Sequence, residues 1–595
     1  MSEILTPVQP QPASAISYDT GGDVRLRVFS SIPEDVEFRK QWDDLVLGAQ
    51  CPEVFYTWEW AEAVLRAYGR SLRPMLFAGH RQHQLIGIAA LNLDPDRYAS
   101  FLTATTADYC DFVSTAADRE IFLYLVMGEL RRMRVRGLRL ANLPADSASV
   151  PAVKAAAQVS GYSVFVRPAY VCAQVDLRSQ ADRHAAAESA RRRLKKLAGK
   201  LEEPVLANAC GEDDFRKEFP SFSMAHVARF LATGRISNLV RSDRRGFLQH
   251  LANLLSPKGW LALSTLKFGG RSIAWNYGFC FAGKWFYYQP TFNPEHRQLS
   301  PGSNLLSRII LQAAEDPAIH SVDLGLGEEH YKHRYAQGAR QTLYVTGSCS
   351  KTEFARSVCR TQLAQWAKRS PRIERHARAW RSGIGRIKGQ IASGEFAANA
   401  RRSIAPLADR LAGRSGPHFI EVPVEIGNPD PDLKLLPVSL NLLAEAAMQY
   451  EDDAETLEYL RRCAARLDDE RTRGFVLTTR DFVAVHFCWT VPASRLRMPG
   501  LPPDNSVLLI DPFTPVSQRG RRYEAQCASR IAANLRAQGK QLWACNAGLH
   551  IKWESILHGA RASIWRRAKW LLKRFSLPKV AGEVSPGKTG MDSAA

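Results

Sequence analysis

The sequence predicts an α/β (α+β) protein made of several consecutive units. Its 595 residues exceed what one hydrophobic core accommodates, so two to four compact units are expected. The composition, with 45% hydrophobic and 23% charged residues, is that of a soluble globular protein. Segments with strand periodicity and segments with helix periodicity alternate along the chain, which predicts mixed sheets covered by helices.

Residues 1–22 are predicted to be a disordered leader. They contain Pro, Ser and Gly and no basic region followed by an apolar core, so they do not resemble a signal peptide. No apolar run is long enough to cross a bilayer. The eleven cysteines are odd in number and include no C-x-x-C pair. This pattern favours reduced thiols in a cytoplasmic protein and predicts neither a zinc site nor a disulfide framework.

A first unit is predicted over residues 23–170. The expected elements are strands at 24–30, 73–79, 84–91 and 137–142 and helices at 33–47, 58–68 and 118–135. Trp58 and Trp60 are interpreted as core aromatics. Asp108 and Asp111 lie in a loop-like stretch, which we interpret as a solvated turn, with acids of an acceptor site as the alternative.

A second unit is predicted over residues 171–352, with strands at 170–177, 260–267 and 272–281. Six cations crowd a short helix near its start: Arg191, Arg192, Arg193, Lys195, Lys196 and Lys200. Either they form a solvated face or they form an electrostatic platform for a phosphate-bearing donor. His226 and Arg229, one helical turn apart, are expected to form a surface pair.

The stretch from Trp285 to Arg334 predicts a strand (285–289), a helix (305–314) and a second strand (321–324). Ser300 is a suitable N-cap, Pro301 suits the first helical position, and Gly302 allows close approach of a ligand. Free N–H groups at such a helix start favour an anion, although an ordinary capped helix has the same pattern. Candidates for holding a phosphorylated donor are Gln298, Ser300, Gly302, Ser303 and Asn304.

At SPGSNLLSRIILQAAE and VDLGLGEEHYKHRYA the sequence resembles the cellulose-biosynthesis (CelD-type) acetyltransferase-like domain of the GNAT superfamily, which is related to FemAB-like transferases. Further pieces match in the family's order over roughly residues 25–350: FYTWEWAEAV, DYCDFV, ARRRLKKLAGKLEE and GGRSIAWNYGFCFAGKWFYYQPTFNPE. The resemblance implies a twin-GNAT arrangement and acyl transfer from a thioester donor, usually acyl-CoA, to an amine or hydroxyl.

Candidate catalytic residues lie near the end of the predicted strand 321–324 and in the loop after it: Asp323, Glu328, Glu329, Tyr331 and Lys332. A partly desolvated carboxylate there is a candidate general base, and Tyr331 is a candidate acid for the leaving thiolate. The alternative is an Asp323–Lys332 ion pair that only shapes the loop. No Ser-His-Asp or Cys-His pattern indicates a covalent intermediate, so direct attack is expected.

Residues 353–417 are predicted to be a basic helical linker. Between residues 356 and 414, 14 Lys and Arg against 3 acids give +11, about half of the net +21 of the chain. Residues 561–574 repeat the pattern of cations interleaved with apolar residues. Both segments are candidates for an anionic membrane surface, with a charged linker or packing on a neighbouring domain as the alternatives. Nucleic acid is not expected, because no separate RNA-binding motif is found.

A third unit is predicted over residues 418–578, before a disordered tail at 579–595. Its expected elements are strands at 475–479, 482–490, 506–513 and 542–545 and a helix at 523–538. The segment before this helix resembles the GNAT cofactor segment, but Arg522 and Glu524 occupy two positions where the superfamily has small residues. We therefore interpret this unit as a degenerate GNAT-like domain, with Asn546 after its last strand.

The function expected from sequence is acyl-CoA-dependent N- or O-acyl transfer to a sugar, amine or lipid-linked precursor of the envelope or of an exopolysaccharide. The enzyme is expected in the cytoplasm, at the inner face of the membrane, without a metal. Two alternatives stay open: a FemAB-like transferase that uses aminoacyl-tRNA, and a non-catalytic scaffold of polysaccharide synthesis at the membrane surface.

Overall fold

A computed structural model describes residues 15–19, 23–197, 204–209, 211–327, 329–368, 419–424, 430–496, 502–503 and 505–545. They divide into two compact units. The first comprises the described residues within Met1–Phe396 together with Ser439–Arg466, and the second those within Ala397–Val438 and Leu467–Ala595. Most of the expected basic linker and the segments 561–574 and 579–595 lie outside the described residues. Among the described helices, none has the length and apolar character that a membrane span requires.

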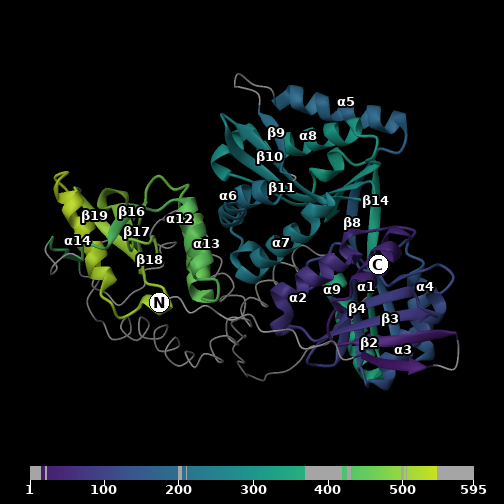
Figure 1. The fold of residues 1–595 in the computed structure, drawn as a ribbon. Helices are drawn as coiled ribbons and strands as arrows, with labels where there is room; N and C mark the ends of the chain where they lie inside the picture. The colour runs from purple at the N-terminus through teal and green to yellow at the C-terminus, as the bar shows by residue number, and fades with distance from the viewer. Residues whose placement is uncertain are drawn as a thin grey trace, which may run out of the picture. The chain divides into compact units, whose positions relative to one another are not determined.

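The first unit contains two halves with the same order of elements (Figure 1). In the first half this order is β2 (Val24–Phe29), α1 (Val36–Leu47), α2 (Trp58–Tyr68), β3 (Pro74–Arg81), β4 (Gln84–Leu93), β5 (Tyr98–Phe101), α3 (Arg119–Arg132), β7 (Gly137–Pro144) and α4 (Ser149–Val159). Two short strands, β1 (Ala15–Asp19) and β6 (Val113–Ser114), pair with β2 and β4. The strands and helices predicted for this region are confirmed within a few residues, whereas β1, β5, β6 and α4 were not predicted, and β1 lies within the expected disordered leader.

The second half repeats the order after the basic helix α5 (Gln180–Leu197). It consists of β9 (Val205–Ala209), α6 (Glu212–Ala232), α7 (Ser242–Leu255), β10 (Leu261–Phe268), β11 (Arg271–Phe281), β12 (Lys284–Phe292), α8 (Pro301–Glu315) and β13 (Ser321–Leu326). Figure 1 shows α5 and α8 on one side of its strands and α6 and α7 on the other. The core between α5, α8 and the sheet is apolar and includes Leu305, Ile309 and Val322.

Two long strands join the halves into one 14-stranded sheet. β8 (Ser163–Asp176) pairs antiparallel with β13 of the second half, and β14 (Gly338–Ser348) lies between β7 and β8. The last strand of the second half therefore completes the sheet of the first. The boundary expected at residue 170 falls inside β8, because this strand serves both halves.

The second unit has a six-stranded sheet in the order β15-β20-β19-β18-β17-β16. The strands are β15 (Phe419–Glu421), β16 (Lys434–Pro437), β17 (Arg473–Thr478), β18 (Ala484–Pro492), β19 (Ser506–Phe513) and β20 (Gln541–Cys545), and α14 (Tyr523–Arg536) connects β19 to its parallel neighbour β20. Two helices between β16 and β17, α12 (Leu440–Gln449) and α13 (Ala454–Ala464), belong to the first unit and pack on α6.

A buried ionic cluster ties the halves of the first unit together. The Glu53 carboxylate is fully buried, and its Oε1 accepts from Lys284 Nζ on β12 at 2.6 Å and from Arg340 Nη1 on β14 at 2.5 Å. Arg340 also pairs with Asp146 at 2.9 Å. Burial raises the pKa of Glu53, and the two cations oppose this shift. One side chain of the first half thus neutralises two cations on strands that the second half contributes.

We predict that Glu53→Gln lowers the free energy of unfolding by about 3–5 kcal/mol, because it leaves Lys284 without a carboxylate partner and Arg340 with Asp146 alone, while keeping the side-chain volume. Urea unfolding at neutral pH measures the change. Glu212→Gln is the matched control, since its pair with Arg216 on α6 is exposed and contributes about 0–1 kcal/mol. A loss for Glu53→Gln as small as the control's would contradict the prediction.

Candidate functional site

The start of α8 is open to an anion. Ser300 precedes it in the left-handed conformation (φ 48°, ψ 49°), and Pro301 occupies the first turn. Ser300 occupies the N-cap position and Pro301 begins the helix as expected, but the Ser300 side chain makes no capping hydrogen bond. The first turn contains no acidic residue. The positive end of the helix dipole is therefore not neutralised by the helix's own side chains.

Two arginines from other elements lie beside this helix start. The Arg229 guanidinium of α6 lies 4.8 Å from the centre of the Phe292 ring. That ring in turn lies 3.5 Å from where a Cβ would stand on Gly302. On the other side, Arg193 of α5 stacks at 4.5 Å on Tyr335, whose hydroxyl donates to Ser303 O at 3.2 Å. Two cations thus reinforce the preference of this helix start for an anion.

The helices that correspond to α8 in the first half and in the second unit, α3 and α14, begin differently. Asp118 precedes α3 and pairs with Arg81, and Glu120 stands in its first turn. Arg522 in the left-handed conformation precedes α14, and Glu524 stands in its first turn. Carboxylates at a helix start satisfy the dipole and repel a phosphate. Of these three helices, α8 is the one whose start suits a phosphorylated ligand.

The strand before α8, β12, and the strand after it, β13, diverge. β12 and β13 pair in parallel over three positions, Lys284 to Phe286 against Ser321 to Asp323, and then separate. We call the divergence after these positions the fork. Beyond Phe286, β12 keeps β11 on one edge, so its other edge can offer backbone groups to a ligand.

A loop of the first half, residues 102–112, reaches into the fork. The Tyr288 hydroxyl of β12 donates to Thr106 O. Asp108 Oδ2 lies 3.0 Å from the position of a Cβ on Gly325, and Tyr287 O lies 3.5 Å from the same point. Gly325 has φ +72° and leaves room where a side chain would meet the carboxylate. The Asp108 carboxylate therefore lies against β13 at Gly325, where β13 passes close to Tyr287 of β12.

Asp323 is the buried acceptor at the base of the fork. It is 1% exposed, and its Oδ2 accepts from the Tyr109 hydroxyl at 2.7 Å and from Gln174 Nε2 at 3.1 Å. Its Oδ1 accepts from Gly325 N at 2.8 Å. Three donors from the loop, β8 and β13 satisfy a carboxylate that has lost its contact with water.

The Asp108 carboxyl has the perturbed pKa of an acid/base group. Burial, followed by the nearby Asp323 carboxylate, raises the pKa of Asp108 to about 7. Lys332, the Leu326 N–H and Arg244 oppose this shift. The Asp108 stretch is a loop as expected, but the carboxyls of Asp108 and Asp111 are only partly exposed in it. Two neighbouring carboxyls in unlike surroundings, one held by donors and one near its midpoint at neutral pH, are a common acid/base arrangement.

Lys332 holds the loop after β13. It is 4% exposed, and its Nζ donates to Leu326 O at 2.7 Å and pairs with the exposed Glu329 at 2.8 Å. The alternative interpretation had proposed an ion pair between Lys332 and Asp323. The structure pairs Lys332 with Glu329 instead. Tyr331 packs against the core beneath α8, and burial raises its pKa. Glu328 lies outside the described residues.

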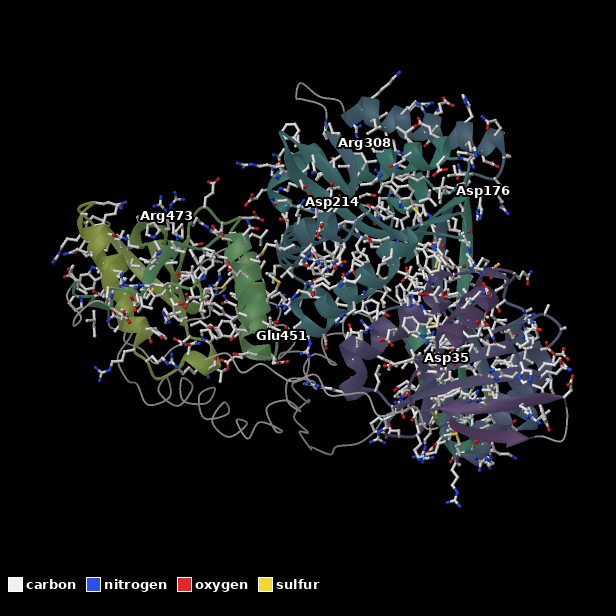
Figure 2. The ribbon with its side chains drawn as sticks, viewed as in Figure 1. Asp35, Asp176, Asp214, Arg308, Glu451 and Arg473 are labelled. Atoms are coloured by element: carbon white, nitrogen blue, oxygen red, sulfur yellow. The ribbon has the colours of Figure 1, made fainter. Side chains whose placement is uncertain are left out.

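The other candidate donor residues have different surroundings. Gln298 and Ser300 are exposed, and Gly302 and Ser303 are partly exposed. Asn304 is buried, and its Oδ1 accepts at 2.9 Å from Nε of Arg308, which Figure 2 labels on α8. Since Asn304 is engaged within the helix, the accessible part of the set is the segment 298–303.

His226 is buried, so the expected surface pair with Arg229 is wrong. Its Nδ1 lies 2.8 Å from Ser237 Oγ, and its ring stacks on Phe230 with centroids 4.7 Å apart. Burial, followed by the charges of Arg229 and Arg244, lowers the pKa of His226 to about 3. The imidazole is therefore neutral and has a structural role in the packing of α6.

A small polar cavity lies on the first-half side of the site. Its lining includes Asp111, Arg119, Ser147, Ser149 and Arg340. The Arg340 guanidinium lies 4.8 Å from the Tyr109 ring, whose hydroxyl reaches Asp323. The polar groups of this cavity also have protein partners, since Ser147 Oγ donates to Asp111 Oδ2 at 2.5 Å and Arg340 pairs with Glu53 and Asp146.

Residues 184–333, which contain α8 and the fork, match the family described as Acetyltransferase (GNAT) domain. No curated protein matches the chain. The second half is thus similar to a GNAT acetyltransferase domain over these residues, and with its repeated order of elements the first unit has the fold of tandem GNAT-like halves. The CelD-type assignment is finer than this match and stays an expectation.

Several solved structures are similar to the chain. FemX has a TM-score of 0.39 at 9% identity, covering 52% of this chain and 95% of FemX. A tandem GNAT protein from the clavulanic acid biosynthesis pathway has a TM-score of 0.33 at 14% identity, covering 55% and 99%. L-PGS from Bacillus licheniformis has a TM-score of 0.34 at 11% identity, covering 51% and 95%.

We predict that Asp108→Asn changes the pH dependence of stability. The unfolded chain releases the Asp108 proton near pH 4 and the folded chain near pH 7, so wild-type stability falls as pH rises between these values. The fall attributable to Asp108 is up to about 4 kcal/mol, at about 1.4 kcal/mol per pKa unit. Urea unfolding from pH 4 to pH 8 compares the variant with Asp213→Asn, an exposed control on α6. Parallel wild-type and Asp108→Asn curves would contradict the assignment.

Proposed function

We propose that the protein is an acyl-CoA-dependent N- or O-acyltransferase whose active site is the fork. The observation that carries this proposal is the position of the Asp108 carboxyl, with its pKa near 7, against Gly325 of β13 at the fork. These strands flank α8, the helix whose start suits a phosphate. An acid/base group and an anion site on adjoining elements are what transfer from a phosphorylated thioester requires.

The donor is assigned to the start of α8 and the free edge of β12. The N–H group of Gly302 faces the pyrophosphate, and Arg193 and Arg229 supply the charge. Gly302 matters because a larger side chain would meet the Phe292 ring or the ligand. The thioester arm follows the β12 edge from Phe292 toward Tyr287, which brings the carbonyl to the fork.

Asp108 is assigned as the general base. The acceptor amine or hydroxyl attacks the thioester carbonyl, its proton passes to Asp108, and the tetrahedral intermediate collapses with release of the CoA thiolate. The Asp323 carboxylate, held by Tyr109 and Gln174, keeps the pKa of Asp108 near neutrality. Tyr331, whose raised pKa keeps it protonated, is assigned as the acid for the thiolate. No enzyme-bound acyl intermediate is needed.

The acceptor is assigned to the polar class, an amine-bearing or hydroxyl-bearing sugar or lipid-linked precursor. The support is the cavity lined by Asp111, Ser147 and Arg340, whose groups match several hydroxyls better than an apolar chain. The CelD-type resemblance adds the expectation of an envelope or exopolysaccharide precursor. An aminoacyl-tRNA donor and a scaffold without donor binding are the outcomes that the next experiment separates from this proposal.

We predict that acetyl-CoA binds the wild-type protein and that Gly302→Trp abolishes binding, because the indole fills the approach to the α8 start. Isothermal titration calorimetry with acetyl-CoA and a longer acyl-CoA measures it. Ile121→Trp, an exposed position in the first turn of α3, is the matched control and should bind normally. Loss of binding in Ile121→Trp alone would move the donor to the first half. Absence of binding by the wild type would reject acyl-CoA, leaving charged tRNA to be titrated next.

We predict that Asp108→Asn lowers kcat about 10²–10⁴-fold, because the general base is removed. Thiol release from acetyl-CoA with a panel of amino sugars and amines gives the assay. The wild-type kcat should rise with pH through about 7, and the variant should lose this limb. Asp111→Asn, in the acceptor cavity, should raise KM with a smaller effect on kcat. An unchanged pH profile in Asp108→Asn would exclude Asp108 as the base.

A further inference from the structure

The second unit brings three metal-binding side chains together inside its core. His486 and Cys488 stand two residues apart on β18 and so share one face of the strand. Cys527 lies on α14, the helix that packs against this strand. The Cys488 and Cys527 sulfurs are 3.4 Å apart, and a ring nitrogen of His486 and both sulfurs lie within 4.8 Å of one another. All three side chains are buried.

The His486 imidazole has one nitrogen engaged and one without a partner. Its Nδ1 lies 2.8 Å from Thr514 Oγ1, just after β19. Its Nε2 is buried and has no hydrogen-bond partner among the residues that the structure describes, although the side chain is 1% exposed. An unsatisfied buried ring nitrogen costs free energy unless something binds it. When Nδ1 donates to the threonine hydroxyl, Nε2 carries the lone pair that a metal ligand needs.

We propose that the second unit holds a Zn²⁺ ion through His486 Nε2, Cys488 Sγ and Cys527 Sγ, with Thr514 fixing the imidazole. Sulfur and imidazole donors select Zn²⁺ over Mg²⁺ or Ca²⁺, which prefer oxygen. At Zn–S bonds of about 2.3 Å, a tetrahedral ion holds its sulfurs about 3.8 Å apart, close to the separation found here. Binding releases one proton from each thiol, so each sulfur binds as a thiolate.

Charge balance favours this ion in an apolar core. Two thiolates and a neutral imidazole cancel the two charges of Zn²⁺, so the buried complex has no net charge. Cu⁺ with the same ligands would leave a buried negative charge among Leu477, Val485 and Ile531. The fourth position is open to water, which keeps the complex uncharged. A disulfide would join the two sulfurs but leave His486 Nε2 unsatisfied.

The test is metal analysis of the full-length protein purified under reducing conditions and loaded with Zn²⁺ or Co²⁺. We expect one Zn²⁺ per chain and, with Co²⁺, a thiolate-to-cobalt charge-transfer band. Cys527→Ser and His486→Gln should lose the bound metal and the band. Thr514→Val should keep the ligands but bind Zn²⁺ about 10–100-fold more weakly in competition with a chromophoric chelator, because the orienting contact is gone.

Cys463→Ser is the matched control, a buried cysteine of α13 in the first unit, and it should retain the metal. Three results would overturn the proposal: wild-type protein without stoichiometric metal and without the cobalt band, metal retained by Cys527→Ser, or a Cys488–Cys527 disulfide found by mass spectrometry in metal-free wild type. The cobalt spectrum of the wild type decides the matter even if the cysteine variants do not fold.

Discussion

The buried carboxylate of Asp323 is the interaction on which the candidate site depends. It is satisfied only because Tyr109 of the first half, Gln174 of the shared strand β8 and the Gly325 N–H of its own strand converge on it. That convergence fixes the loop of residues 102–112 in the fork. Its negative charge then disfavours a second charge on Asp108. A single satisfied carboxylate thus both orders the contact between the halves and tunes the neighbouring acid.

The three repeats share an order of elements but differ where a ligand would bind. Only α8, of the three equivalent helices, begins without a carboxylate and with external cations beside it. The first half instead contributes a loop and its acids to the site of the second. The third repeat carries Glu524 at the helix start and a set of buried sulfur and imidazole donors below it. Repetition of one fold has here allowed the binding and supporting roles to separate.

Local pattern predicted most elements well: α2 begins at Trp58 and ends at Tyr68 as expected, and β19 covers residues 506–513. The apolar periodicity of α8 begins only at Leu305, but the Ser-Pro pair at residues 300 and 301 marked where the helix begins. Asp323 and Lys332 could be predicted as site residues, because they lie at the end of a predicted strand and in the loop after it. Asp108 was only an alternative candidate, because its place beside Gly325 comes from a contact with a residue more than two hundred positions later in the chain. The contact of Cys527 with Cys488, 39 residues earlier on a strand, could not be predicted from the spacing of the cysteines either.

The position of β14 has a consequence for how the protein is made. During synthesis, β7 and β8 leave the ribosome long before Gly338–Ser348, the strand that lies between them. Until β14 has been synthesised, the facing edges of β7 and β8 have unpaired backbone groups that can pair with other chains. The first half is therefore not expected to mature domain by domain as it emerges, and a chain that stops before residue 338 should need a chaperone or aggregate.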